Sequence, residues 1–341
     1  MSKLLKVAYF GSDNFSINCL KHILPLRTNH IGHFDIITRS PKLAGRGMTN
    51  LKDVPIASFA AGLGLPVIRA DKKIDFEPLC QTSYDLCIAV SYGRLIPSSF
   101  LSTLKYGGLN VHPSILPRYS GPAPLQRALL NNDKTTGVTV QTLHPTEFDK
   151  GDILLNEEYT IKPDENLESL SEELSNKGGI LLKEIIEQGL YDKNSPKYNT
   201  LQPQLEFSYA SKINKSEAKI DWTTFTAGDI IRRAGVLESL YTFKQWTPKK
   251  KNKKSNGLQL KRVVMSGIKE YKLKETDNEC EKVAEFNLNK EGDVYVKTID
   301  GYFTAEMFKT EGYIAEEPSK FFNGLNKKFG SKDACFVDDT L

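Results

Sequence analysis

The sequence lacks the long apolar runs, paired cysteines and clustered histidines that mark membrane, disulfide-rich and metal-binding proteins. Every apolar run falls far short of the roughly eighteen residues needed to span a bilayer, so no transmembrane segment is predicted. The five cysteines are scattered and include no C-x-x-C pair, which favours reduced thiols over a disulfide framework or a zinc site. The five histidines are equally dispersed, so no structural metal is predicted.

A three-glycine dinucleotide fingerprint is also absent. The first expected strand, residues 5–10, runs into Gly11 and then into a helix, an order typical of dinucleotide-binding domains. Asp13 and Ser16, however, stand where the second and third glycines of that fingerprint would be. The sequence therefore does not predict NAD binding at this turn.

The composition is that of a globular protein with unevenly placed charge. Its 341 residues, 39% hydrophobic and 26% charged, suit one large domain or two ordinary ones. Residues 1–206 hold 22 basic and 22 acidic side chains, whereas residues 207–341 hold 24 and 20. The whole formal charge of +4 therefore lies in the second part of the chain.

Most of that excess comes from a basic run, residues 244–262, that contains no acidic residue. One interpretation is a solvated loop tip. The other is a phosphate-binding surface, whose sequence-independent affinity falls with salt. The basic residues of the run are Lys244, Lys249, Lys250, Lys251, Lys253, Lys254, Lys261 and Arg262.

Strands and helices alternate through the first 190 residues. This alternation predicts an α/β fold with a doubly wound, mainly parallel sheet of the Rossmann-like kind. Residues 191–206 are typical of a polar linker, and the short apolar runs that follow predict a small β-rich domain at residues 207–335. The expected strands are residues 5–10, 34–38, 66–69, 86–91, 109–111, 136–142 and 153–161, and the expected helices are residues 15–24, 55–63, 123–130 and a longer one from 167 that bends at Gly178 and Gly179.

The strongest candidate for chemistry lies at the end of the strand at residues 109–111. Asn110 and His112 project to the same side of this strand, and Pro113 ends it where they emerge. In an open α/β sheet the carboxyl ends of the strands are where ligands bind. With Asp149 downstream, the amide, the imidazole and the carboxylate are the groups that an acyl-transfer site needs. Without other evidence, the Asn-x-His pattern has a second interpretation, in which Asn110 caps a loop and His112 is a surface histidine.

This stretch resembles the signature of the folate-dependent formyltransferases. In that family Asn-x-His-x-Ser-Leu-Leu-Pro is followed by Gly-x-x-Pro and, after a strand, by Leu-Asp-x-Gly. Further similar segments are FGSDNFS, SPKLAGRG, SYGRLIP, FSYASKINKSEAKIDW and PSKFFNGL, and the fungal mitochondrial members of the branch that formylates charged tRNA are most similar. The positions that match the signature are Asn110, His112, Ser114, Pro117, Gly121, Pro124, Phe148, Asp149 and Gly151.

The resemblance implies a formyltransferase catalytic domain at residues 1–190 and a β-barrel-like tRNA-binding domain at residues 207–335. It also implies transfer of a formyl group from 10-formyltetrahydrofolate to the α-amino group of initiator methionyl-tRNA. Asn110 would bind the oxyanion, and His112 would bind the oxyanion or move a proton. Asp149 would orient His112, favour its charged form or accept the amine proton through a water.

The resemblance also implies which residues bind the two substrates. Folate would be bound by Arg94, Leu95 and Ile96 of the SYGRLIP segment and by Ser114 and Pro117, although without the family that segment is an ordinary strand-end loop. Arg46 would reach the acceptor end of the tRNA, its alternative being an exposed loop arginine. Asp152 is interpreted as a turn residue. Phosphate contacts are expected at Lys249, Lys250, Lys251, Lys253 and Lys254.

Other functions remain open from the sequence. One alternative is an enzyme with the same formyl-transfer chemistry but another acceptor: a small amine, or water in a formyl-tetrahydrofolate hydrolase. The other alternative is a tRNA-binding protein that has the formyltransferase fold but no catalytic activity. The AGRG segment and the basic second half favour tRNA. We expect a monomer without a membrane partner. The resemblance implies the mitochondrial matrix, although the first strand begins near Leu5 and no conventional presequence is visible.

Overall fold

The structure is a computed structural model that describes residues 4–44, 47, 49–247 and 259–339. The chain divides into two compact units, residues 1–212 and 213–341, and each is considered by itself. The expected linker lies within the first unit, where Leu201 donates a backbone hydrogen bond to the carbonyl of Ile153 at 2.8 Å. Residues 207–212 also belong to this unit.

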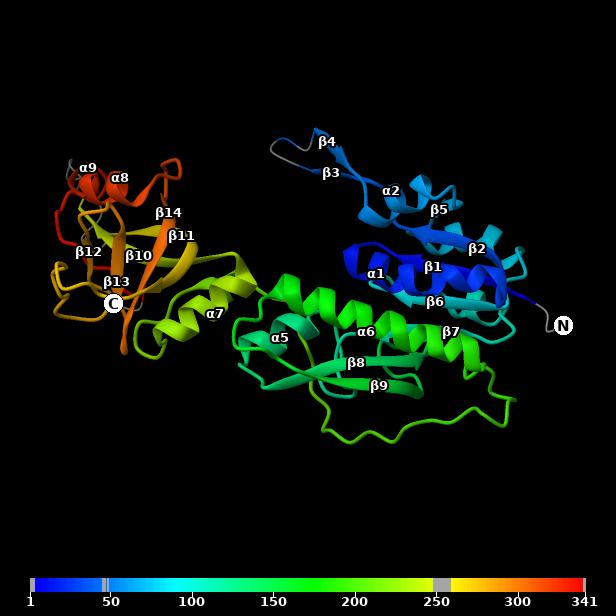
Figure 1. Ribbon diagram of the computed structural model, residues 1–341. Helices are drawn as coiled ribbons and strands as arrows, with labels where there is room; N and C mark the ends of the chain where they lie inside the picture. Colours follow the sequence, from blue (N-terminus) through cyan, green and yellow to red (C-terminus); the bar gives the residue numbers. More distant parts are fainter. Residues whose placement is uncertain (1–3, 45–46, 48, 248–258, 340–341) are drawn as a thin grey trace. The chain divides into compact units, whose positions relative to one another are not determined.

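A seven-stranded sheet forms the first unit (Figure 1). Five neighbouring strands, in the order β5-β2-β1-β6-β7, are parallel, and β8 and β9 continue the sheet antiparallel. The predicted doubly wound, mainly parallel sheet is therefore confirmed. The strands are β1 Leu5–Gly11, β2 Ile31–Thr38, β5 Val67–Arg69, β6 Leu86–Val90, β7 Gly108–His112, β8 Thr135–Thr142 and β9 Ile153–Thr160.

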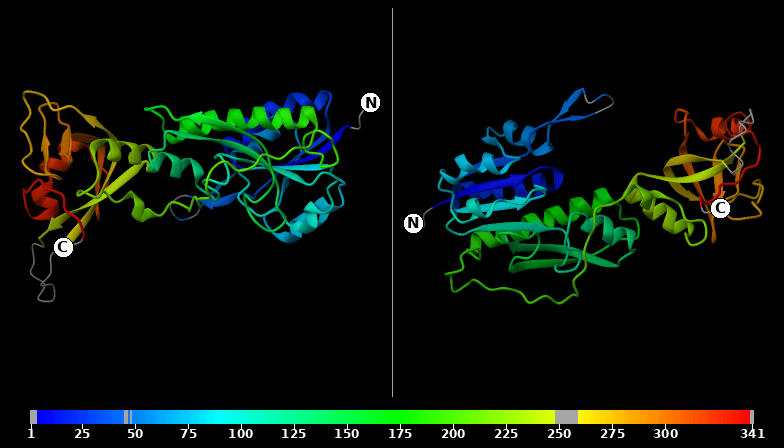
Figure 2. Two further views of the ribbon diagram at one scale, coloured as in Figure 1. Left: turned by 90° about the horizontal axis from the view of Figure 1, so that it is seen from below. Right: turned by 180° about the vertical axis from the view of Figure 1, so that it is seen from behind.

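Helices cover both faces of this sheet. On one face α1 (Asn14–Ile23) and α6 (Leu167–Gln188) lie side by side, as Figures 1 and 2 show. On the other face Phe10 of β1 packs against Phe76 and Phe100, which belong to a 3-10 helix (Lys73–Phe76) and to α4 (Ser98–Leu101). Between them lies the short helix α3 (Glu77–Cys80).

The two glycines at which the sequence predicts a bend are packing positions in an uninterrupted α6. A Cβ atom on Gly178 would lie 2.6 Å from Cγ1 of Val111, and one on Gly179 would lie 2.5 Å from the His22 ring. The glycines therefore let the helix approach β7 and α1 closely. This contact also shows that Val111 faces α6, so its neighbours Asn110 and His112 face the opposite side of the sheet.

The remaining elements of the first unit are short. Helix α2 spans Pro55–Gly62 and α5 spans Pro124–Leu130, close to the expected bounds. The polar connection at residues 39–53 contains a small antiparallel ribbon, β3 (Lys42–Ala44) with β4 (Asn50–Lys52), which the sequence did not predict because its strands are short. In the described part of the chain, no helix has both the length and the apolar character to cross a membrane.

The second unit is a closed antiparallel sheet, in agreement with the predicted barrel-like domain. Its strands follow the order β10-β11-β14-β13-β12. The last described segment joins the two edges, because Phe336 donates to the carbonyl of Ala284 and Val337 to that of Phe243. The elements are α7 Ala227–Leu237, β10 Ser239–Trp246, β11 Gln259–Tyr271, β12 Phe286–Leu288, β13 Val294–Lys297, β14 Tyr302–Thr310, α8 Pro318–Asn323 and α9 Leu325–Phe329.

Candidate active site

Strands β7 and β8 bring polar side chains together on the sheet face opposite α6. Asn110 pairs with Gln141 and His112 pairs with Thr139 in the antiparallel register of these strands. Directly paired residues point to the same side of a sheet, so these four side chains share one face. β7 is also parallel to β6, which places the end of β7 beside the SYGRLIP loop that follows β6.

His112 and Asp149 form the centre of this cluster. Nδ1 of His112 lies 3.3 Å from Oδ1 of Asp149, and the two side chains are only 7% and 8% exposed. The other ring nitrogen, Nε2, lies 2.9 Å from the backbone carbonyl of Tyr119. Both ring nitrogens therefore face oxygen acceptors. A neutral ring carries one N–H and satisfies one of them, whereas the doubly protonated, charged ring satisfies both.

The backbone around Asp149 explains the Asp-x-Gly part of the signature. Asp149 has a positive φ of 56°, a conformation that aspartate tolerates better than most residues. A Cβ atom on Gly151 would lie 1.6 Å from the carbonyl oxygen of Thr142, so only glycine fits there. The turn is closed where Thr142 donates to the carbonyl of Asp152 at 2.9 Å. The loop thus returns Asp149 towards the end of β7.

Three further groups contact the Asp149 carboxylate, and one of them is the Ser120 hydroxyl, whose oxygen lies 3.5 Å from Oδ2. The backbone N–H of Gly121 donates to Oδ2 at 2.8 Å, and Nε2 of Gln141 donates to Oδ1 at 3.4 Å. Gln141 is 2% exposed, and its Oε1 accepts a hydrogen bond from the backbone of Gly151 at 3.1 Å. Gln141 therefore links the Asp149 carboxylate to Gly151, two residues further along the same loop.

Sequence reasoning missed Gln141, although a signal was available. β8 alternates in the strand period, so Thr139 and Gln141 point to the same side while Val138 and Val140 point towards α6. A buried glutamine on the same face as the two polar residues of β7 is a candidate for positioning them.

Asn110 differs from its neighbours because its side-chain amide is open. The side chain is half-buried, and no partner for the amide occurs among the described residues. The N–H groups of this amide are therefore available to a ligand that enters beside His112 and Asp149.

Ser114 and Pro117 serve the fold of the loop that follows β7. The Ser114 hydroxyl donates to the carbonyl of Arg118 at 2.7 Å, and the Ser114 carbonyl accepts from Thr139 Oγ1 at 2.7 Å. Ser114 is 1% exposed, so a direct contact of its hydroxyl with folate would require the loop to change. The carbonyl of Pro117 accepts from the backbone of Ser208.

Some side chains of the SYGRLIP loop, residues 91–97, are buried in the core and others are exposed. Ile96 is 4% exposed and belongs to the apolar cluster that contains Phe100, whereas Leu95 is 43% exposed and Arg94 is exposed. Residues 93–96 make no backbone–backbone hydrogen bonds with other described residues. The parts of this loop that a flat ring system can reach are therefore Leu95, Arg94 and free peptide groups.

Asp152 lies outside the cluster. Its carboxylate accepts from Lys193 Nζ at 3.1 Å and from the Tyr198 hydroxyl at 3.0 Å. The hydrogen bond from Lys193 and then that from Tyr198 lower the pKa of this carboxyl group. The two contacts hold residues 193–198 against the turn that contains Asp152. They are consistent with the interpretation of Asp152 as a turn residue.

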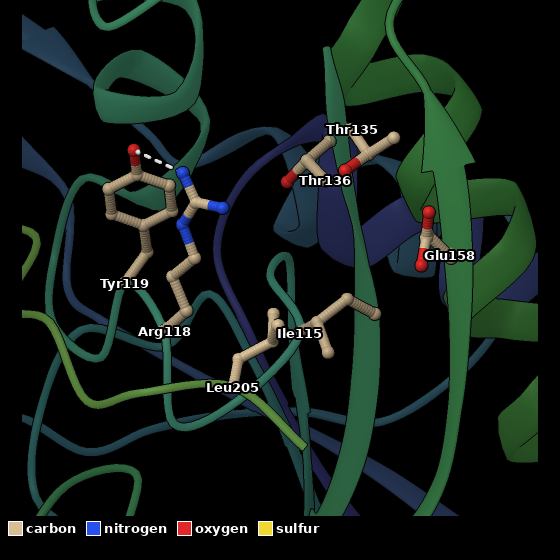
Figure 3. Close-up of a pocket in the computed structure, with 7 residues that line it drawn as sticks. All are labelled: Ile115, Arg118, Tyr119, Thr135, Thr136, Glu158 and Leu205. Carbon is tan, nitrogen blue, oxygen red and sulfur yellow. Dashed lines mark hydrogen bonds between the residues drawn. The ribbon is translucent and has the colours of Figure 1, made fainter. Parts of the chain in front are cut away.

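A separate pocket lies beside the loop that follows β7 but does not contain the cluster (Figure 3). Arg118 and Tyr119 line one side, with Arg118 Nη2 3.5 Å from the Tyr119 hydroxyl and 2.8 Å from Asp133. None of Asn110, His112 and Asp149 lines it. The lining residues are Ile115, Arg118, Tyr119, Thr135, Thr136, Glu158 and Leu205.

The predicted tRNA-binding residues lie outside the described part of the chain. Arg46 lies between β3 and β4, and the lysines lie between β10 and β11. These residues are Arg46, Lys249, Lys250, Lys251, Lys253 and Lys254, and their roles stay predictions.

Comparison of the sequence with known proteins identifies relatives of this chain. Residues 5–186 match the family model described as formyl transferase. The chain is 30% identical to the mitochondrial methionyl-tRNA formyltransferase of Saccharomyces cerevisiae in an alignment that covers 96% of this chain and 91% of that enzyme. The methionyl-tRNA formyltransferase of Ehrlichia ruminantium is 38% identical over 185 residues, which are 53% of this chain and 60% of that enzyme.

A solved structure shares the fold. The sugar 3N-formyl transferase WlaRD matches 92% of this chain and 100% of its own, with a TM-score of 0.57 and 18% identity. At this identity the likeness concerns the fold alone.

Proposed function

We infer the function of this chain from its membership of the formyl transferase family and from its likeness to a mitochondrial methionyl-tRNA formyltransferase over nearly its whole length. It transfers the formyl group of 10-formyltetrahydrofolate to the α-amino group of methionyl-tRNA. The observation that carries this function is the alignment over 96% of the chain, which extends through the second unit as well as the catalytic one.

The reaction forms one C–N bond and breaks another. The neutral amine of the methionyl group attacks the formyl carbon, and the carbonyl electrons move to oxygen. The tetrahedral intermediate then expels N10 of the folate, which takes up a proton while the amine loses one. The site must therefore stabilise an oxyanion and carry a proton from one nitrogen to the other.

The open amide of Asn110 suits the oxyanion. It lies on the same strand face as the His112–Asp149 pair, and it has no other partner among the described residues. An N–H donor that lies where negative charge develops stabilises that charge. We assign oxyanion binding to Asn110 on this basis.

The His112–Asp149 pair suits charge stabilisation and proton transfer. The carbonyl of Tyr119 and the carboxylate of Asp149 hold the imidazole between them and so fix the orientation of its ring. A charged imidazole stabilises the oxyanion, while the carboxylate, held by Gly121 and Gln141, accepts the amine proton directly or through water. Gln141 acts as a positioning residue for that carboxylate.

An acceptor competition assay tests the proposed function. The purified chain, supplied with 10-formyltetrahydrofolate, should formylate charged initiator tRNA with a far higher kcat/KM than free methionine or its esters, and it should release little formate to water. Faster formylation of a small amine, or formate release that tRNA does not suppress, would instead identify a small-molecule enzyme or a hydrolase.

The folate site should be visible by hydrogen exchange. Because residues 93–96 have no backbone hydrogen bonds within the described chain, their amides should exchange quickly in the free protein. A stable analogue of 10-formyltetrahydrofolate should slow exchange within residues 91–97. Protection confined to the turn at Gly11 would place the ligand elsewhere and remove Arg94, Leu95 and Ile96 from the folate site.

The effects of substitutions on tRNA affinity and on formylation rate should distinguish the lysines of residues 249–254 from Arg46. Neutralising the five lysines within residues 249–254 together should weaken binding of any tRNA, and each lost phosphate contact should flatten the salt dependence by roughly one unit of slope. Arg46→Ala should lower the formylation rate at saturating tRNA more than it lowers affinity. If the salt dependence of tRNA binding stayed the same, the lysines would belong to a solvated loop and would not contact phosphates. If Arg46→Ala left the maximal rate unchanged and only weakened binding, Arg46 would contact a phosphate and would not position the acceptor end.

We propose the mitochondrial matrix as the location, because the yeast relative is a mitochondrial enzyme. We also propose initiator tRNA as the physiological acceptor and a monomer as the working form. Protease protection in isolated mitochondria and light scattering of the purified protein test the location and the oligomeric state.

A further inference from the structure

The most exposed aromatic side chains of the described chain gather around the candidate active site. Tyr209 is 63% exposed, Phe148 is 59% exposed and Phe207 is 56% exposed, whereas the next most exposed aromatic ring, Tyr313, reaches only 36%. Large aromatic rings left in water at one place mark a binding surface more often than isolated exposed residues do. We call these three residues the aromatic platform.

Tyr209 is fixed next to the catalytic carboxylate. Ser120 donates to the carbonyl of Ser208 at 3.0 Å, and Ala210 donates to the carbonyl of Ser120 at 2.7 Å. A Cβ atom on Gly121 would lie 2.7 Å from Cε2 of Tyr209, so the ring lies against the residue whose N–H binds Asp149. The segment that presents the ring is therefore held by the same loop that shapes the site.

The other two rings belong to segments that border the site. Phe148 immediately precedes Asp149 in the chain. Phe207 lies two residues before Tyr209, and Lys150 Nζ stands 4.4 Å from the centre of its ring. An exposed lysine over an exposed ring combines a positive charge with a stacking surface. This combination is the footprint of single-stranded nucleic-acid binding.

We propose that the aromatic platform stacks the unpaired bases at the 3′ end of the acceptor tRNA, and that Lys150 contacts a phosphate between them. The proposal rests on the proposed function and names a subsite for its acceptor. The reacting amine is joined to the terminal ribose through only a few bonds, so the terminal base must lie close to Asp149. A base has an apolar face and its backbone is anionic, and the platform offers complementary groups to both.

Fluorescence of a modified tRNA tests the proposal. With 2-aminopurine in place of the 3′-terminal adenine, binding to the unchanged protein should quench the fluorescence through stacking. Tyr209→Leu and Phe207→Leu should reduce that quenching and lower kcat/KM for methionyl-tRNA by about fivefold to a hundredfold per stacked base. The KM for the folate should not change.

Tyr313→Leu is the matched control, because Lys261 Nζ lies 5.1 Å from the Tyr313 ring in the second unit. It should leave the quenching intact. Quenching that is equal in Tyr209→Leu and the unchanged protein would overturn the proposal, as would a raised KM for folate with an unchanged KM for tRNA. Because quenching is measured without catalysis, a chain that binds the tRNA but does not formylate it would refute the proposed function and leave the platform standing.

Discussion

Replacement of Asp149 by alanine is expected to lower kcat for formyl transfer by about 10²–10⁴-fold, the usual contribution of a positioned acid–base group. The carboxylate contacts His112 and is held by Gly121 and Gln141, so its loss removes both the proton acceptor and the partner of the imidazole. His112→Ala should cost at least tenfold. Since the two groups act as one unit, the double variant should cost little more than the worse single variant.

Asp149→Asn separates charge from geometry. Asparagine tolerates the positive φ at this position and keeps an oxygen to accept from the N–H of Gly121. This variant should fold normally and remain slow. Asp149→Ala should also lose about 1–3 kcal/mol of stability, because the N–H of Gly121 loses its partner. Near-normal turnover of Asp149→Asn, with folding checked by circular dichroism, would remove the carboxylate charge from the mechanism.

Replacement of Asn110 by alanine is expected to lower kcat by about 10²–10³-fold, the magnitude found when one oxyanion donor is removed. The Asn110 amide has no hydrogen-bond partner in the described chain, so its removal leaves no protein group unpaired and stability should stay within about 0.5 kcal/mol. The KM for methionyl-tRNA should change little.

The matched control for this variant is Gln141→Leu. Gln141 lies opposite Asn110 in the sheet but binds Asp149 and Gly151 instead of facing a ligand. This substitution should reduce both stability and kcat. If Asn110→Ala proved unstable and the loss of activity followed the loss of folded protein, the amide would be a structural group and not the oxyanion donor.

Much of the fold could be predicted because its signals are local. Strands β1 and β6 of the first unit carry nearly continuous apolar runs, and the strands alternate with helices, a pattern typical of a covered parallel sheet. Most of the elements that the sequence did not predict are short, such as α3, α4 and the β3–β4 ribbon. Helix α7, which has 11 residues, was also not predicted, although Thr226 and Asp229 form a capping box that marks its start.

The candidate site could be predicted only in part, because most of its contacts join residues distant in sequence. The period of the strand placed Asn110 and His112 on one side, and the family signature added Asp149. The alternation of β8 could have indicated that Gln141 shares the face of Thr139, but its contact with Asp149 depends on the closure of the loop at residues 143–152. The contact of Gly121 with Asp149 depends on loop closure in the same way, and loop closure is not visible in a single sequence. The aromatic platform likewise depends on the backbone pairing of Ser120 with residues 208–210.

A single turnover with a labelled donor tests most directly whether Asn110 and Asp149 act in formyl transfer to methionyl-tRNA. The protein is loaded with 10-formyltetrahydrofolate that carries a radioactive formyl group and is then mixed with excess methionyl-tRNA. With the unchanged protein the label should move to the methionyl amino group in one fast step, whereas with Asn110→Ala and Asp149→Asn it should stay on the folate over the same interval. Label that appears as free formate, or that reaches the tRNA equally fast in both variants, would contradict this mechanism.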